Sequence, residues 1–540
     1  MSVFTFDTKE GNPVTKDDIK TLGEKLGVHE TKEVDINDYT TLLGVFHDAC
    51  QEIMDMDDYL QEVDLERFPR KDVRYPTKEE NKLGGWGWKF SIKDEKPTST
   101  GDRLLEGSKV CVKDCVAIAG VPMLLGTSFI TDYTPTTDAT IITRMLEHGA
   151  TIEGKAVCEN LCHSATSHSS GTGYVHNPRA IGYSTGGSSS GTGCIVADPA
   201  EDIDIGIGAD QGGSVRIPSA WSGLYGMKPT FGLMPFTGCA TNEATNDCLG
   251  IMTESVLINA KGLQATAGTD NMDDRGFNVR NGKYYDHLIS LENPKDLTGL
   301  KVGIVIEGFN NPAVEERVKQ CCMDAVKKFE ALGATIEEVS IPLHSKGPLI
   351  WTGISKVGGF LTKMGCGIGR RGTSLNDLND KFAKSLKDAE RWKEAYPSSK
   401  NIYYNGLYAT EKFPTLYGKC MNLSRKLKDD YNTALEKFDI VVMPTVPFVA
   451  RSHCDLDNVK RPLDLLGKQV GLSSNTAPFN QTGHPAMAMP CGLLPIEEGP
   501  LSGSGTKLPV SLQLVGKWYD ENTIYRFAYA FEQSYDWTSL

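Results

Sequence analysis

Two short segments crowded with glycine and serine, lying on either side of a β-type run, constrain the fold of this chain more than any other feature. The segments are STGGSSSGTG (184–193) and ADQGGSVRIP (209–218), and the run between them is DIDIGIG (202–208). Glycine has no Cβ, so such loops let backbone N–H groups approach a ligand closely. Two flexible surface loops would be the simpler interpretation, but a pair that flanks a strand favours a functional site.

The rest of the chain beyond about residue 108 alternates short β-type runs with helical stretches. Examples are SKVCVKDCVAI (108–118), DATIITRMLEHGA (138–150) and KVGIVIEG (301–308). Strands that alternate with helices are typical of an α/β sheet, in which the connecting loops carry the chemistry. The sequence therefore predicts the α/β class.

The residues before about 108 have a different composition and periodicity. Between residues 15 and 65 apolar positions recur at helical spacing, whereas 66–107 is rich in proline, glycine, lysine and tryptophan and is predicted to be irregular. We therefore predict an N-terminal helical region and connector over 1–85, followed by a catalytic domain over 86–540. Within that domain, residues 350–437 are predicted to be mostly helical and are a candidate wall of the substrate pocket.

Charge and cysteine content exclude several classes of protein. The net charge of −14 argues against nucleic acid or an anionic membrane as the main partner. The chain shows neither a run of about 18 apolar residues nor the apolar core of a secretory signal. Its 14 cysteines follow no disulfide framework, which predicts reduced thiols in a cytoplasmic protein. Cys158, Cys162, His163 and His168 match no closed zinc pattern, so no metal is expected.

Lys113 is the best candidate for a catalytic base. A serine hydroxyl is a poor nucleophile until its proton is removed, and a neutral lysine can remove it. Lys113 ends an apolar β-type run, so its stem can be buried while its amine points into the loops. A surface pair with Asp114 is the alternative interpretation, and the pattern alone leaves both open.

Three other motifs suggest different chemistry. GATIEGK (149–155) begins like a phosphate-binding loop, but Ala156 replaces the hydroxyl residue that would hold Mg²⁺. The sequence around Ser189 satisfies G-x-S-x-G, which would make Ser189 an α/β-hydrolase nucleophile. Such an enzyme also needs a later histidine, and none of His344, His453 and His484 lies in a recognisable motif. Cys158 and Cys194 lie near no obvious base, and buried reduced thiols are the simpler interpretation.

The residues around the two loops resemble the amidase signature family. GGSSSGTG and the later GADQGGSVRIPSAWSGLYGMKP match its signature segments, and VKDCVAIAGVPMLLGT matches the stretch that contains its lysine. FDIVVMPTVP and NTAPFNQTGHPAMAMPCG are similar to its C-terminal core. The resemblance runs from about 105 to 535 and is greatest to enantioselective nitrile-pathway amidases, with a fungal amidase or urethanase as a further option. It implies a mixed central β-sheet covered by helices on both sides.

The resemblance assigns roles to three residues. Ser214 matches the family's nucleophile, Ser188 its bridging serine and Lys113 its general base. In the family, the peptide bond that enters the bridging serine is cis. The implied mechanism has neutral Lys113 take a proton from Ser188, which takes one from Ser214, so that Ser214 attacks the amide carbonyl.

The resemblance also implies an oxyanion hole, formed by the backbone N–H groups of Gln211, Gly212, Gly213 and Ser214. Neither a metal nor an organic cofactor is needed for this chemistry. One departure from the family lies next to the bridging serine, where Ser190 replaces a glycine. The interval between the two serines is also slightly longer than usual in the family.

The expected function is hydrolysis of a small amide to a carboxylic acid and ammonia. Hydrolysis of a carbamate such as urethane is the nearest alternative, because it would use the same three residues. A transamidase component that supplies ammonia from glutamine, and a non-catalytic binding protein, are further alternatives. Trp221 and Thr237 are candidate substrate-binding residues, and the family likeness implies a homodimer.

Overall fold

A twelve-stranded mixed sheet contains, near its middle, the run that separates the two glycine- and serine-rich segments. This run forms β7 (Ile205–Asp210), and all of its residues are buried. β7 pairs in parallel with β3 (Lys109–Lys113) and in antiparallel with β9 (Cys248–Thr253). Burial of both faces of the strand explains why no polar side chain occurs in it before Asp210.

The computed structural model describes residues 5–97, 102–277, 279, 281–365, 370–385, 388–458 and 461–540. Beyond β3, in order across the sheet, lie β4 (Thr151–Ala156), β2 (Trp86–Ile92) and β1 (Lys71–Arg74). Beyond β9 lie β8 (Tyr225–Lys228), β13 (Ala486–Pro495), β14 (Lys507–Gly516), β12 (Ile440–Pro444), β10 (Lys301–Val305) and β11 (Thr335–Val339). A separate ribbon joins β5 (His176–Asn177) to β6 (Ala180–Ser184).

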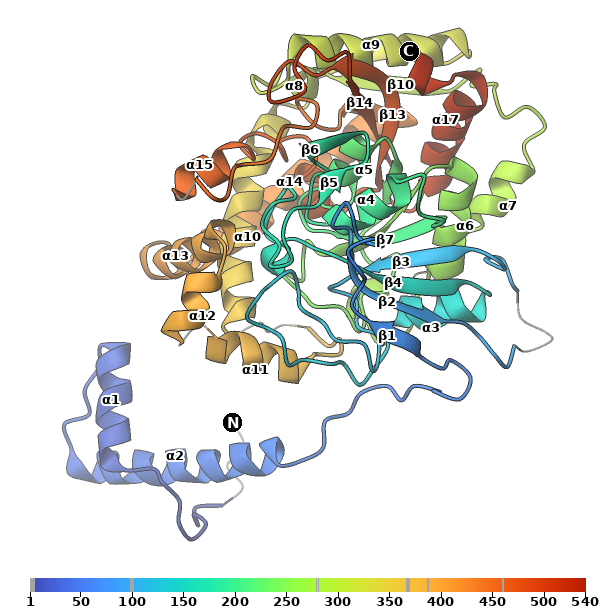
Figure 1. Ribbon diagram of the computed structural model, residues 1–540. Coiled ribbons are helices and arrows are strands. Elements are labelled where there is room, and N and C mark those ends of the chain that lie inside the picture. Colours follow the sequence, from blue (N-terminus) through green and yellow to red (C-terminus); the bar gives the residue numbers. More distant parts are fainter. Residues whose placement is uncertain are drawn as a thin grey trace. The chain divides into compact units, whose positions relative to one another are not determined.

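Glycines at alternate positions of β7 let a helix pack closely on one face of the sheet. A Cβ on Gly206 would lie 2.5 Å from a side chain of α4 (Ser190–Ala197). Ile205 points to the opposite face, where α6 (Val256–Thr266) lies, since a Cβ on Gly262 would be 3.6 Å from the Ile205 side chain. Helices therefore cover both faces of the mixed sheet, as the resemblance implies (Figure 1).

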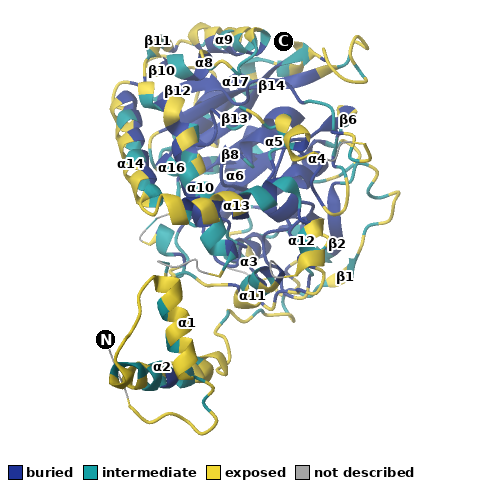
Figure 2. Ribbon diagram, turned by 90° about the vertical axis from the view of Figure 1, so that its left-hand side faces the viewer, coloured by how far each residue is buried: buried dark blue, intermediate teal, exposed yellow. Residues whose placement is uncertain are grey.

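The helices form two layers around the sheet, whose interior is buried (Figure 2). On the side of α6, a continuous row is formed by α3 (Thr140–Glu147), α6, α17 (Glu521–Ser534) and α9 (Glu316–Ala331). Elsewhere in the same unit, α10 (Gly347–Lys363) packs against α13 (Pro397–Lys412) and α14 (Leu416–Leu435). Further helices of this unit are α5 (Arg216–Ser222), α7 (Tyr284–Ile289), α8 (Ile306–Phe309), α11 (Asn376–Ser385), α12 (Ala389–Glu394), α15 (Pro462–Gly467) and α16 (Pro478–Thr482). Short 3₁₀ turns cover η1 (Asn160–Cys162), η2 (Asp274–Gly276), η3 (Pro342–Lys346) and η4 (Trp537–Ser539).

The stretch from 66 to 107 is more regular than its composition predicts. It contributes β1 and β2 to the sheet, and β2 pairs in antiparallel with β4. Trp86, Phe90 and Ile92 of β2 are buried. Apolar and aromatic residues occupy every second position of β2, as a half-buried strand requires, but the glycines, prolines and lysines around them favour the prediction of a loop. The compact unit that contains the sheet accordingly begins at Glu62.

In the other compact unit, Met1–Gln61, the residues from 5 onward form two helices. α1 (Lys16–Leu26) begins with a capping box of Thr15 and Asp18, and α2 (Glu33–Met54) follows it. No residue of α1 is buried, and Gly44 is the single buried residue of α2. Among the described helices of the whole chain, none is both long and apolar enough to cross a membrane.

Removal of residues 1–61 should leave the larger unit folded. Every hydrophobic core cluster among the described residues is built from Phe68 and later residues, so the truncation removes no core side chain. Thermal unfolding followed by circular dichroism should therefore show the same single cooperative transition for residues 62–540 as for the full chain. A truncated chain that aggregates or unfolds without cooperativity would contradict this expectation.

Candidate active site

Lys113 lies at the end of β3 with its side chain turned inward. Its Nζ donates hydrogen bonds to Ser188 Oγ at 2.8 Å and to the carbonyl of Ala209 at 3.1 Å. Lys113 and Ser188 are both completely buried. The alternative surface pair with Asp114 is therefore wrong, because that carboxylate lies 3.4 Å from Lys155 Nζ instead. The structure thus brings a lysine amine and a serine hydroxyl into direct contact.

The segment that carries Ser188 is held by Glu159. The peptide bond between Gly187 and Ser188 is cis. A Cβ on Gly187 would lie 2.6 Å from a backbone oxygen, so the packing leaves room for glycine alone. The Glu159 carboxylate accepts hydrogen bonds from the hydroxyls of Ser190 at 2.7 Å and Ser169 at 2.5 Å. Burial raises the pKa of Glu159 to about 7, against the opposing effect of these hydrogen bonds.

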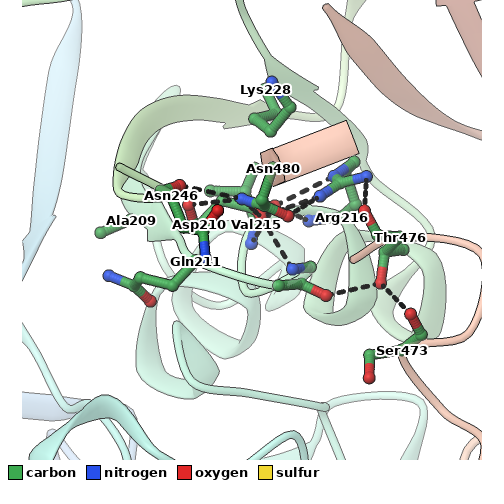
Figure 3. Close-up of polar contacts among 12 residues, drawn as sticks. Ala209, Asp210, Gln211, Val215, Arg216, Lys228, Asn246, Ser473, Thr476 and Asn480 are labelled. Atoms are coloured by element: carbon green, nitrogen blue, oxygen red, sulfur yellow. Dashed lines mark hydrogen bonds and ion pairs between the residues drawn. The ribbon is translucent and has the colours of Figure 1, made fainter. Parts of the chain in front are cut away.

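The loop that carries Ser214 is organised by a buried ion pair (Figure 3). Arg216 donates to Asp210 from Nε at 3.0 Å and from Nη2 at 2.9 Å. The same carboxylate accepts the backbone N–H of Gly213 at 2.7 Å and that of Val215 at 3.1 Å. Burial alone would raise the pKa of Asp210, but the charge and hydrogen bonds of Arg216 hold it far below its usual range. Asp210 is therefore an anion that fixes the turn around Ser214.

Two further side chains hold the carbonyl groups of this loop. Trp351 Nε1 donates to the carbonyl of Gln211 at 2.7 Å, and Thr476 Oγ1 donates to that of Gly212 at 2.7 Å. Gly213 has a φ of +132° and no room for a Cβ, which would lie 2.3 Å from Thr476 Oγ1. Because the N–H of Gly213 donates to Asp210, the predicted oxyanion hole needs correction at this position. The N–H groups of Gln211, Gly212 and Ser214 remain as the predicted donors.

Ser214 lines a cavity of about 480 Å³ and is itself partly exposed. The N–H of Ser189 donates to the carbonyl of Ser214 at 3.3 Å, which joins the two glycine- and serine-rich segments behind this cavity. Its wall includes residues of three segments that lie far apart in the sequence. These are Cys162, His163, Ser164 and Ala165; Trp351, Thr352, Ser355 and Lys356 of α10; and Ser398, Asn401 and Ile402 of α13.

The two predicted substrate-binding residues do not line this cavity in the described structure. Trp221 is fully buried and donates from Nε1 to the carbonyl of Phe448 at 2.9 Å, so its ring belongs to the core. Thr237 lines a different cavity, together with Arg275. The helical stretch after residue 350 supplies Trp351 and Lys356 instead, and helical spacing alone cannot tell which face of α10 meets the loops.

The residues considered for a metal are placed in different surroundings. Cys162 and His163 line the cavity of Ser214, whereas the His168 ring lies against Tyr396 and His453. Within the described ranges, no group of three or more histidine, cysteine, aspartate or glutamate side chains is arranged to hold a metal ion.

The protonation of Lys113 depends on three buried thiols near it. Burial lowers the pKa of Lys113, whereas negative charge on Cys162 raises it. Hydrogen bonds from Cys115 and Cys158 lower the pKa of Cys162. With Cys162 ionised, the pKa of Lys113 lies above its ordinary value. With Cys162 as a neutral thiol, burial is the largest remaining influence and favours the neutral amine.

The comparisons with known proteins identify the family of this chain. A family model described as Amidase matches residues 91–525. The chain belongs to the Amidase family. It is 35% identical over 472 residues to an enantioselective amidase of Rhodococcus rhodochrous, covering 86% of each chain. It is 31% identical over 441 residues to a glutamyl-tRNA(Gln) amidotransferase subunit from a Geobacillus strain, covering 80% of this chain and 84% of that one.

Solved structures share the fold of this amidase. A bacterial aryl acylamidase that belongs to the amidase signature enzymes superposes with a TM-score of 0.66 and 20% identity, covering 80% of this chain and 84% of that one. The family and the fold class predicted from sequence are thereby confirmed.

Replacement of the buried carboxylate should destabilise the amidase strongly. Asp210→Asn leaves the Arg216 charge buried without a countercharge, which costs about 3–5 kcal/mol of unfolding free energy. Urea denaturation followed by tryptophan fluorescence would measure the change. Asp202→Asn is the matched control, because the Asp202 side chain is 87% exposed beside Lys109 and the unfolding midpoint should not move. Equal midpoints for the two variants would show that the buried pair does not hold the loop.

Removal of Cys162, the thiol with the largest effect on the pKa of Lys113, should change the pH dependence of the amidase. Cys162→Ala removes the negative charge that raises the pKa of Lys113, so the neutral amine should persist to lower pH. The acidic limb of the kcat/KM profile on an amide should therefore move to lower pH. Cys194→Ala, a buried thiol in another core cluster, is the control and should leave the limb in place. An unmoved limb in Cys162→Ala would mean that Cys162 is a neutral thiol.

Proposed function

We propose that this amidase hydrolyses a small linear amide to a carboxylic acid and ammonia through an acyl-enzyme on Ser214. The observation that carries the proposal is the 2.8 Å hydrogen bond from Lys113 Nζ to Ser188 Oγ. The adjacent Ser189 N–H donates to the carbonyl of the partly exposed Ser214 at 3.3 Å, so the two serine segments are in contact. A completely buried lysine that contacts a hydroxyl rather than a carboxylate is poised to exchange a proton with it.

The proposed reaction moves protons along the three side chains. Neutral Lys113 takes the proton of Ser188, and Ser188 takes that of Ser214, while Ser214 Oγ forms a bond to the amide carbonyl carbon. The proton then returns through Ser188 to the leaving nitrogen, the C–N bond breaks, and ammonia departs. Water attacks the resulting ester by the same relay and releases the acid.

The loop supports this sequence by holding the developing negative charge. The N–H groups of Gln211, Gly212 and Ser214 are the proposed donors to the oxyanion. Asp210 and Trp351 fix the loop in advance, and donors that need no reorganisation stabilise a transition state most effectively. Each such donor contributes roughly 3–4 kcal/mol in comparable enzymes.

A glutamine-dependent transamidase component is the second candidate, because curated relatives at about 30% identity include amidotransferase subunits. Release of free ammonia by the purified chain from amides other than glutamine would favour the hydrolase. Ammonia release from glutamine that requires a second protein would favour the transamidase.

We also propose that the amidase works as a homodimer in a reducing, cytoplasmic compartment. The proposal on the compartment is supported by the free thiols of all the described cysteines. Sedimentation at micromolar concentration tests the oligomeric state.

Loss of the nucleophile should abolish both turnover and active-site labelling. Ser214→Ala should lower kcat by roughly 10³-fold or more on primary amides and prevent reaction with a fluorophosphonate probe. Lys113→Ala should lower kcat/KM by at least about 100-fold, since the general base is gone. Ammonia release and gel fluorescence are the measurements.

Ser222→Ala provides the matched control, because Ser222 is a buried serine of α5 that does not line the cavity of Ser214. It should label and turn over normally. Labelling of a folded Ser214→Ala variant would show that another residue is the nucleophile, and full activity of Lys113→Ala would remove Lys113 from the mechanism.

A further inference from the structure

We propose that this amidase acts on amides whose acyl part ends in a carboxylate, and that Lys356 binds this carboxylate. The inference rests on the proposed function, because it concerns the substrate of the same cavity. Lys356 belongs to α10 and lines the cavity of Ser214 together with Trp351, Thr352 and Ser355. The spacing of these four residues places them on one face of the helix.

Lys356 is a cation without a countercharge in the described part of the chain. Burial lowers its pKa to about 8, and no neighbouring carboxylate opposes that effect. The amine is nevertheless mostly protonated at pH 7. On α14, by contrast, Lys426 forms an ordinary ion pair with Asp430 at 3.1 Å. A half-buried ammonium that faces a cavity without a partner is a site for an anion from outside the chain.

The one carboxylate in the cavity wall, among the described residues, is already engaged. Glu243 accepts hydrogen bonds from Thr245 Oγ1 at 2.6 Å and from Tyr417 Oη at 2.8 Å. Burial raises its pKa, which reduces its negative charge near neutral pH. Behind the wall, Lys363 adds a second buried cation, whose Nζ donates to Asn242 Oδ1 at 2.8 Å. The cavity therefore favours an anionic ligand over a cationic one.

Several buried polar atoms of the same wall have no hydrogen-bond partner in the described structure. They include Nε2 of His163, Nδ2 of Asn242 and the side-chain amides of Gln211 and Asn246. Burial, together with the charges of nearby lysines, lowers the pKa of His163 and keeps its ring neutral. Buried polar groups are rarely left unsatisfied, so these atoms indicate a ligand with polar groups beyond its amide.

The helix sets the distance between the two ends of this ligand. The Trp351 ring packs against the loop of Ser214, since a Cβ on Gly212 would lie 2.5 Å from it. Lys356 follows five residues later, an axial rise of about 7.5 Å. In a primary amide the leaving group is ammonia, so whatever reaches Lys356 belongs to the acyl part. The geometry therefore points to monoamides of dicarboxylic acids with several methylene groups.

The test compares hexanamide with adipamate, the monoamide of hexanedioic acid, in which a carboxylate replaces the terminal methyl group. The wild type should have the higher kcat/KM on adipamate. In Lys356→Met, the ratio of kcat/KM for adipamate to that for hexanamide should fall by roughly tenfold or more, mainly through the KM of adipamate. Lys356→Arg should keep the preference. Lys356→Glu should prefer 6-aminohexanamide, whose terminal group is a cation.

Lys419→Met is the matched control, because Lys419 is an exposed lysine of α14, and its ratio should equal that of the wild type. An unchanged ratio in Lys356→Met, or no preference for the cationic amide in Lys356→Glu, would overturn the assignment of Lys356. If the wild type hydrolyses hexanamide in that case, the proposed function still stands. If it hydrolyses none of the three amides, the proposed function fails instead.

Discussion

The buried ion pair of Asp210 and Arg216 is the interaction on which the candidate site depends. Desolvation of two charges costs several kcal/mol per ion, and this cost is offset when every remaining donor and acceptor is satisfied. Here the carboxylate also accepts from Asn480 Nδ2 at 2.8 Å, and the guanidinium also donates to Gln513 Oε1 at 2.8 Å. Since Asn480 belongs to α16 and Gln513 to β14, the pair ties the loop of Ser214 to the C-terminal part of the sheet.

Two buried lysines on adjacent strands show how neighbouring positions acquire different chemistry. Burial lowers the pKa of Lys155 of β4, but the Asp114 carboxylate that it faces opposes this effect and favours the charged form. Lys113 of β3 faces a hydroxyl and a carbonyl, so loss of its proton leaves no carboxylate without a partner. The same side chain is therefore structural on one strand and suited to proton transfer on the next. This difference comes from the partners and not from the degree of burial.

The fold class and the family can be predicted from sequence because both rest on local features. Each strand, each helix and each of the two glycine-rich segments can be recognised from a short run of consecutive residues. β2 escapes such a prediction although its apolar residues occupy every second position, because the glycines, prolines and lysines on either side of it favour a loop. Trp221 follows closely after the segment of Ser214, and this position suggests that it binds substrate, but its ring packs into the core. Ser190, which replaces a glycine of the family, is explained only by the structure, in which its hydroxyl donates a hydrogen bond to the Glu159 carboxylate.

The details of the cavity wall cannot be predicted in this way, because the wall joins segments whose contacts depend on tertiary packing. The chemistry is built at the ends of β3 and β7, whereas two of the three segments of the wall, α10 and α13, lie more than a hundred residues later. The Trp351 hydrogen bond to the carbonyl of Gln211 connects the two parts. Because this bond fixes a carbonyl of the oxyanion loop, a shift of α10 would move the peptide groups that face the substrate. Substrate binding along α10 and the placement of the oxyanion donors are therefore physically coupled.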